Sequence, residues 1–249
     1  MVTNKEVNEK KEPGCIRVLT DKKYFHVGNL FLKRTLREHE WQVNVRDEII
    51  TPSPSYVQRW MNEAAALQFL SERIDVPLPK FQCAFHDDGA FHLITEFVDG
   101  VNMSELQPQQ KEIVMKEVEE HVTTLHSLRS TALGGLDGGF LCPPYRVFSQ
   151  WKPYNTWSQR RDSKGIEDEE YVFCHNDLSQ HNIIVDPDTL KIKAIVDWEF
   201  AGFWPKWFEA AFWKRSGPSV AINDEGDDSK RLRGWLLEIC RERVPHQAD

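Results

Sequence analysis

The sequence predicts an α+β protein of two lobes, a small β-rich lobe followed by a mainly helical lobe with a small β insert. Residues 15–98 consist largely of short β-type runs around one helix, and helical patterns dominate residues 99–249. The dipeptide Asp99-Gly100 separates the two parts and is typical of a turn. Residues 1–14 are polar and charged, and we expect them to form a flexible tail.

The first lobe is expected to contain five strands and one helix. Gly28-Asn29 is a turn signal between two strand-like runs and predicts a hairpin. A helix is predicted over about 56–72, because Ser55 can cap it and the prolines of 76–79 end it. The strand candidates are residues 15–19, 23–27, 30–34, 81–86 and 92–98.

The second lobe begins with a long predicted helix over about 108–128, whose proline falls in the first turn, where proline is tolerated. Residues 131–170 read as loops with a tryptophan-bearing stretch and an acidic end. The remaining expectations are strands at 170–175, 181–186 and 191–198, and helices at 204–214 and 229–243 around an acidic loop at 223–228.

Charge and composition exclude several classes of protein. Of the 249 residues, 31 are basic and 39 acidic, so the net charge is −8 and we expect no nucleic-acid partner. The start of the chain lacks the apolar core of a signal peptide, and no apolar run approaches the roughly 18 residues of a membrane span. Five scattered cysteines without a CxxC pair favour a reducing compartment, so we expect a cytoplasmic protein without a membrane partner. The composition does not indicate whether the protein binds other proteins.

The segment 173–202 carries the most chemical information. Asp177 ends one strand-like run, Asn182 follows five residues later, and Asp197 ends another run fifteen residues beyond. Because two β-runs joined by a turn bring their ends together, the three side chains can face one small volume. Carboxylate and amide oxygens suit Mg²⁺, and a second carboxylate can orient a hydroxyl and take its proton. The set points to phosphoryl transfer, although each residue alone is a common turn former.

The sequences HNDLSQHN (175–182) and IVDWEFAGFWP (195–205) resemble the aminoglycoside phosphotransferase and choline kinase families, and the second continues as in fungal phosphotransferase-family proteins. The resemblance is dense over 171–213 and implies a protein-kinase-like fold. It further implies that Asp177 is the catalytic base and that His175 supports its loop. It implies that Asn182 and Asp197 are magnesium ligands.

The same resemblance implies a phosphate-binding lysine and a carboxylate that holds it in the first lobe. Lys33 lies on the third predicted strand, and Glu63 lies on the predicted helix in a context similar to the REAAAL helix of the family. A cation there would reach the α- and β-phosphates of ATP. The alternative is that Lys33 is a strand-edge charge and Glu63 a solvated helix residue. Lys22, Lys23 and Arg34 are competing cations that we expect to face solvent.

The run HLITEFVDG (92–100) resembles the hinge between the lobes, where adenine binds backbone groups, and its candidates are Glu96, Phe97 and Val98. The alternative is a plain buried edge strand. One feature departs from kinases: the predicted loop at 19–24 contains no glycine, whereas a kinase covers the phosphates with a glycine-rich loop.

These observations predict a kinase that depends on ATP and Mg²⁺ and transfers the γ-phosphoryl group to a hydroxyl of a small molecule. A protein acceptor is disfavoured, because no A-P-E motif follows Asp197 and Asn176 replaces the arginine before the catalytic aspartate. The acidic clusters 167–170 and 223–228 could attract an amine-bearing acceptor. The alternatives are a pseudokinase that serves as a nucleotide-binding or scaffolding protein, and a metal-dependent hydrolase that uses the same carboxylates.

Tryptophan is abundant, with nine residues. We expect Trp60 and Trp235 to lie in the core and Trp198 to pack under the site. Five others, around the predicted acceptor side, are candidates either for an aromatic wall that binds an organic cation or for ordinary core packing. They are Trp151, Trp157, Trp204, Trp207 and Trp213.

Overall fold

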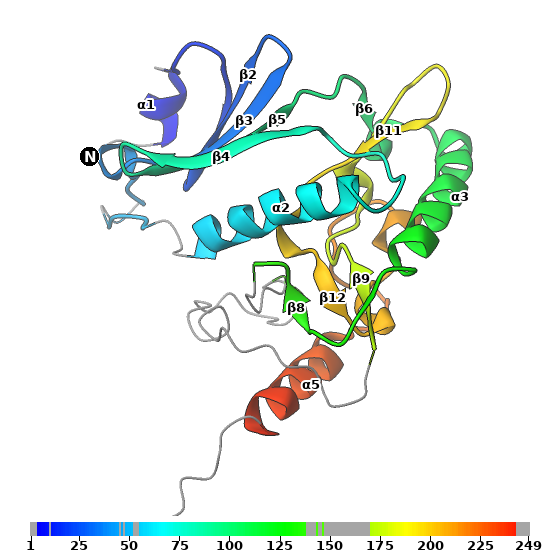
Figure 1. Ribbon diagram of the computed structural model, residues 1–249. Coiled ribbons are helices and arrows are strands. Elements are labelled where there is room, and N and C mark those ends of the chain that lie inside the picture. The colour runs from blue at the N-terminus through cyan, green and yellow to red at the C-terminus, as the bar shows by residue number, and fades with distance from the viewer. Residues whose placement is uncertain are drawn as a thin grey trace, which may run out of the picture.

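The computed structural model describes residues 4–9, 11–44, 46, 48–51, 55–137, 143, 146 and 170–242. It has two lobes, and helix α2 (Ser55–Ser71) lies between the sheet of the first lobe and the strands of the second (Figure 1). The predicted α+β, two-lobed architecture is therefore confirmed. The predicted wall residues Trp151 and Trp157 lie outside the described residues.

The first lobe is built on a five-stranded antiparallel sheet with the order β1-β2-β3-β5-β4. All five strands predicted for it are present. Gly28 adopts a left-handed backbone with φ 61° where β2 turns into β3, as expected for the hairpin. Its strands are β1 (Cys15–Val18), β2 (Lys22–Val27), β3 (Leu30–Thr35), β4 (Phe81–Asp87) and β5 (Ala90–Glu96).

Helix α2 matches the predicted range to within one residue at each end. Its apolar residues Trp60, Ala64, Leu67 and Leu70 are buried, as their helical spacing requires. Trp60 packs with Phe91 and other residues of the sheet, whereas Leu67 and Leu70 belong to the main core, which continues into the second lobe. The helix therefore connects the packing of both lobes.

The second lobe surrounds two small sheets. Helix α3 (Pro108–Leu125) confirms the long predicted helix, although it ends three residues earlier. The sheets have the orders β11-β10-β6 and β7-β9-β12-β8. Among the described residues, no helix is long and apolar enough to cross a bilayer. The other elements are β6 (Val101–Asn102), β7 (Arg129–Ser130), β8 (Gly134–Gly135), β9 (Tyr171–Cys174), β10 (Ile183–Val185), β11 (Ile192–Ile195), β12 (Gly202–Trp204) and α5 (Ser229–Glu242).

The helix predicted over 204–214 is wrong. Strand β12 occupies the start of this range and pairs with β9, and two 3-10 turns follow at Lys206–Phe208 and Phe212–Lys214. Pro205 has an extended ψ of 138° directly after the strand. The aromatic residues of this segment enter the core from successive turns rather than from one helical face, and sequence spacing alone does not separate the two arrangements.

The described part of the predicted tail contains a short helix and contributes Glu12 to an ion-pair network. Residues Asn4–Glu9 form a short helix, α1, and Glu12 lies 2.6 Å from Lys23 and 2.8 Å from Arg34. The same two cations contact Glu40 at 2.6 and 2.8 Å. Lys23 and Arg34 are buried, so the expectation that they face solvent is wrong. Because successive strand residues alternate between faces, the neighbours Lys22 and Lys23 meet different surroundings.

Gly202 allows β12 to lie close to β8, and replacing it with alanine should destabilise the protein. Its strand partner on β8 is Gly135, and an added Cβ would overlap the carbonyl oxygen of Gly134. We expect Gly202→Ala to lower the free energy of unfolding by about 2–3 kcal/mol. Gly234→Ala is the control, because Gly234 lies in α5 with open space around it. Alanine favours a helix more than glycine does, so this variant should have a free energy of unfolding higher by up to about 1 kcal/mol. Urea unfolding measures both, and shifts in the same direction would contradict the prediction.

The Glu40 carboxylate should make the stability of the protein depend on pH in acid. Burial opposes its ionisation, but hydrogen bonds from Lys23, the Arg37 backbone and Arg34 outweigh burial and lower its pKa to about 2. Ionised Glu40 contributes fully to the stability of the fold above pH 4.5, the ordinary pKa of the carboxyl, and this contribution is lost as the pH falls from there towards 2. Glu40→Gln should lower the free energy of unfolding by about 3 kcal/mol at pH 7. Measured by urea unfolding, the stability of this variant should also depend less on pH between 4.5 and 2 than that of the wild type. The exposed Glu38→Gln is the control and should behave as the wild type.

Candidate active site

The ammonium group of Lys33 joins the two lobes. Its Nζ lies 2.9 and 2.7 Å from the carboxylate oxygens of Glu63 on α2, and 2.7 Å from Oδ1 of Asp197, which follows β11. The Lys33 and Glu63 side chains are 11% and 3% exposed, whereas that of Asp197 is 32% exposed and can meet a ligand. The structure thus brings together the three charged groups that the sequence assigns to the nucleotide phosphates and the metal.

The Lys33 ammonium is shared by the carboxylates of Glu63 and Asp197, and the pKa values of these two carboxyl groups shift in opposite directions. Burial would raise the pKa of Asp197, but the Lys33 ammonium outweighs it and holds this pKa below its usual range. Burial raises the pKa of Glu63, and Lys33 only partly opposes the rise. Burial disfavours charged Lys33, yet the two carboxylates hold its pKa well above the usual value. Lys33 is therefore charged and Asp197 ionised at neutral pH.

His175 connects the two loops that carry the predicted catalytic and metal-binding residues. Its Nε2 donates to the carbonyl of Val196 at 3.0 Å, and its Nδ1 accepts from the backbone N–H of Asp177 at 3.2 Å. Burial lowers the pKa of His175, so the imidazole is neutral, as these two contacts require. His175 therefore fixes Asp177 relative to the strand that leads to Asp197.

The contacts of Asn182 fit the predicted metal site. Its Nδ2 donates to the carbonyl of Asp177 at 2.8 Å, which turns Oδ1 away from that carbonyl. The backbone carbonyl of Asn182 accepts from Val196 N–H at 2.9 Å, one residue before Asp197. Asn182 and Asp197 therefore lie side by side where β10 begins and β11 has ended. An amide and a carboxylate oxygen suit Mg²⁺ when phosphate and water complete its shell. Within the described residues, no cluster of three or more His, Cys, Asp or Glu offers a different kind of metal site.

The loop of Asp177 is anchored by Glu209, which the sequence analysis missed. One carboxylate oxygen of Glu209 accepts the backbone N–H groups of both His175 and Asn176, the second at 3.2 Å. Asn176 has a left-handed backbone with φ 68°, and its side chain donates to the carbonyl of Phe200 at 2.9 Å. Burial raises the pKa of Glu209. Sequence patterns contain no signal for this contact, because it links positions more than 30 residues apart through main-chain groups.

Helix α2 is held against the Asp197 segment by two further side chains that the sequence analysis missed. Arg59 forms an ion pair with Glu199 in the 3-10 turn after Asp197. Asn62 donates to the carbonyls of Ala201 at 2.8 Å and Glu199 at 3.2 Å. Arg59 lies four residues before Glu63, on the same face of the helix, and this spacing was the available signal.

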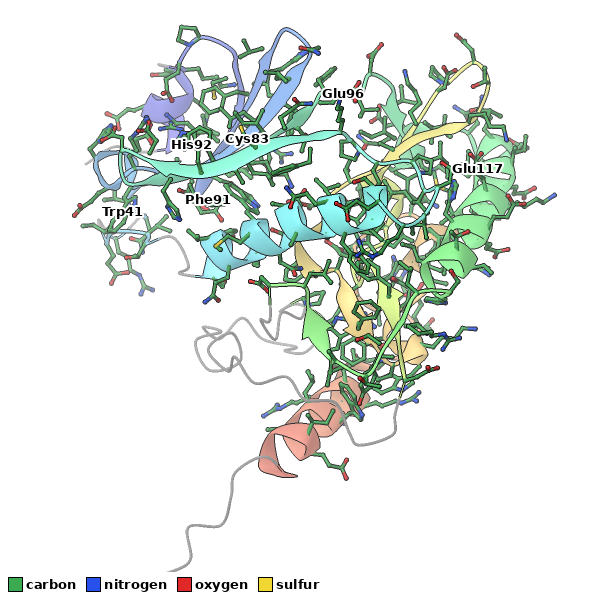
Figure 2. All side chains as sticks on the ribbon, viewed as in Figure 1. Trp41, Cys83, Phe91, His92, Glu96 and Glu117 are labelled. Atoms are coloured by element: carbon green, nitrogen blue, oxygen red, sulfur yellow. The ribbon has the colours of Figure 1, made fainter. Side chains whose placement is uncertain are left out.

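The hinge candidates lie at the end of β5 from which the chain enters the second lobe; Figure 2 labels Glu96 there and Phe91 and His92 towards the other end. The N–H of Glu96 donates to Lys80 and that of Phe97 to Asn29, each at 2.8 Å. Among the described residues, no backbone carbonyl accepts the N–H of Val98. Of the three candidates, Val98 therefore has the amide available to a ligand.

The described tryptophans of the second lobe pack in or against the core rather than form an exposed wall. Trp198 is fully buried, donates to the carbonyl of Ile195 at 2.7 Å and packs against His175, as expected. Trp204 and Trp213 are also buried, and Trp207 is only partly so. The alternative of core packing therefore holds for the described wall candidates.

Comparison with known proteins supports this reading of the fold. Residues 20–218 match the family model described as "Phosphotransferase enzyme family". An aminoglycoside 3'-phosphotransferase from Streptomyces fradiae is 28% identical in an alignment of 155 residues that covers 54% of this chain and 56% of that protein. The chain thus matches only about half the length of this curated relative.

Solved structures of aminoglycoside phosphotransferases are similar in fold. One from Streptomyces rimosus, in complex with ADP and streptomycin, aligns with a TM-score of 0.50 and 16% identity over 98% of this chain and 90% of its own. A type VIII aminoglycoside-3'-phosphotransferase aligns with a TM-score of 0.49 and 18% identity over 96% and 90%. The former likeness supports the two-lobed, protein-kinase-like fold of the chain.

Removing the Glu209 carboxylate should loosen the Asp177 loop. Glu209→Ala leaves the N–H groups of His175 and Asn176 without their acceptor. We therefore expect the free energy of unfolding, measured with urea, to fall by about 2–4 kcal/mol. Glu209→Gln keeps an acceptor oxygen and should lose less. Glu119→Ala, which removes a half-exposed carboxylate paired with Lys214, is the control and should change stability by less than about 1 kcal/mol. Equal losses in Glu209→Ala and the control would contradict the anchoring role.

Proposed function

The chain belongs to the phosphotransferase enzyme family, and we propose that it is a kinase that transfers the γ-phosphoryl group of ATP to a hydroxyl of a small molecule. The contact of Lys33 with both Glu63 and Asp197 carries this proposal, because it holds a cation from one lobe at the predicted metal ligand of the other. Phosphoryl transfer requires mainly such positioning and charge neutralisation.

In this proposal each residue has a distinct task. Lys33 contacts the α- and β-phosphates, and Glu63 keeps it in place. Asp177 accepts the proton of the acceptor hydroxyl, with His175 fixing its backbone. Asn182 and Asp197 would hold Mg²⁺, which supplies charge neutralisation along the phosphates. The adenine ring would bind backbone groups of 96–98, with the Val98 N–H as donor.

The boundary between the two functional units is proposed at residues 98 and 99, so that residues 15–98 bind the nucleotide and residues 99–249 carry the catalytic loop. We infer an amine-bearing acceptor only from the named relatives. The acidic loop 223–228 supports it weakly, because Glu225 and Asp228 are already paired with arginines. The assembled Lys33–Glu63–Asp197 contact favours catalysis over a pseudokinase, and the Lys33–Glu63 pair disfavours a hydrolase.

Asp177→Asn should abolish most of the turnover while ATP still binds. We expect wild-type protein with Mg²⁺ and ATP to release ADP faster when one member of a panel of aminoglycosides, amino alcohols and sugars is added. The variant should lose roughly 10²–10⁴-fold in kcat, because the proton acceptor is gone. Calorimetry should give the same ATP affinity for both proteins.

The matched control is Asp188→Asn, which changes an exposed aspartate in the β10–β11 turn and should keep full activity. Failure of every acceptor to stimulate ADP release from a protein that binds ATP would favour the pseudokinase. Full turnover by Asp177→Asn would contradict the assignment of the base.

A further inference from the structure

The connection between β1 and β2 is a two-residue turn rather than a loop that can wrap a phosphate chain. The N–H of Leu19 donates to the carbonyl of Lys22 at 2.8 Å, which leaves Thr20 and Asp21 as the turn residues. The Asp21 carbonyl accepts from Leu36 N–H at 3.0 Å, and Asp21 itself is buried. A phosphate-binding loop instead presents successive free N–H groups. This turn is therefore a poor substitute for a glycine-rich loop.

Lys22 begins β2 directly after this turn. Side chains two residues apart on a strand share a face, so Lys22 lies on the side of Tyr24, whose strand partner is Lys33. The Lys22 ammonium lies 5.0 Å from the ring centroid of Tyr56 and 5.8 Å from those of Tyr24 and Trp60. Three aromatic faces thus hold this cation on the side of the sheet that carries Lys33.

The Lys22 ammonium contacts aromatic rings but is paired with no carboxylate of the described residues. Among the described residues, no carboxylate oxygen lies within 4 Å of it and no acceptor receives a hydrogen bond from it. Its neighbour Lys23, in contrast, contacts two carboxylates. Burial disfavours the charged form of Lys22, yet attraction by Glu199 and, more weakly, Asp197 holds its pKa above the usual value. Lys22 is therefore charged at neutral pH, on the side of the sheet that carries Lys33.

We propose that Lys22 binds the phosphate chain of ATP and supplies, through its side chain, the positive charge that backbone N–H groups of a glycine-rich loop supply elsewhere. The inference rests on the proposed kinase function. Lysine suits this task because its ammonium is a compact charge on a flexible stem, so it can move from the aromatic rings to a phosphate oxygen. Glu199 is already paired with Arg59, which leaves Lys22 free to make this contact.

The test is a series of affinities for ATP, ADP and adenosine, measured by calorimetry on the full chain with Mg²⁺. Lys22→Met keeps the apolar stem among the rings and removes the charge. It should weaken ATP binding about tenfold or more, ADP binding less, and adenosine binding not at all. Lys22→Arg keeps the charge and should restore most of the ATP affinity.

Lys191→Met is the control, because Lys191 is an exposed cation in the turn between β10 and β11, away from the face of the sheet that carries Lys33, and its affinities should equal those of the wild type. Equal ATP affinity in Lys22→Met and wild type would overturn the role of Lys22 and leave the kinase proposal intact. An equal loss for ATP and adenosine would overturn it too, because it would indicate a damaged lobe. Absence of ATP binding to the wild type would contradict both proposals.

Discussion

The candidate site depends on one shared cation. Lys33 contacts Glu63 and Asp197, which lie 30 and 164 positions away in the sequence. This contact is an electrostatic link between a strand of the first lobe and the segment of the second lobe that carries the predicted metal ligand. Desolvation makes such a buried cluster a weak source of stability, and one ammonium leaves Glu63 with a raised pKa. The arrangement is better explained by what it positions than by the stability that it contributes.

Neighbouring side chains hold the groups of this contact in position. Arg59 and Asn62 attach the same face of α2 to the segment after Asp197, so Glu63 cannot move away from Lys33 without breaking their bonds. On the opposite side, the His175 ring ties the Asp177 loop to Val196. These contacts hold the Lys33–Glu63–Asp197 cluster without an activation segment of the kind that protein kinases place after the metal-binding aspartate.

Local patterns predicted much of this architecture. The strands of the first lobe, α2 and α3 follow from apolar spacing and turn residues. The motif at 175–197 predicted that the segments of Asp177, Asn182 and Asp197 lie close together, as the contacts of Asn182 with Asp177 and Val196 show, and the roles of these residues stay predictions. The failures have a common physical origin. The range 204–214 is so rich in aromatic residues that a helix and a series of core-filling turns have similar patterns. Arg59–Glu199 and Glu209 with the His175 backbone are long-range contacts, and no local pattern records the partner.

The cations of β2 and β3 illustrate the same limit and its consequence. Lys22, Lys23, Lys33 and Arg34 look equivalent in sequence, but strand alternation places Lys22 and Lys33 on one face and Lys23 and Arg34 on the other. Lys23 and Arg34 form ion pairs with Glu12 and Glu40 within the first lobe. Of the first pair, Lys33 contacts the carboxylates Glu63 and Asp197, and Lys22 lies on the same face of the sheet. A tight turn without glycine is therefore compatible with phosphate binding, because the strand that follows it brings a second cation to the face on which Lys33 lies.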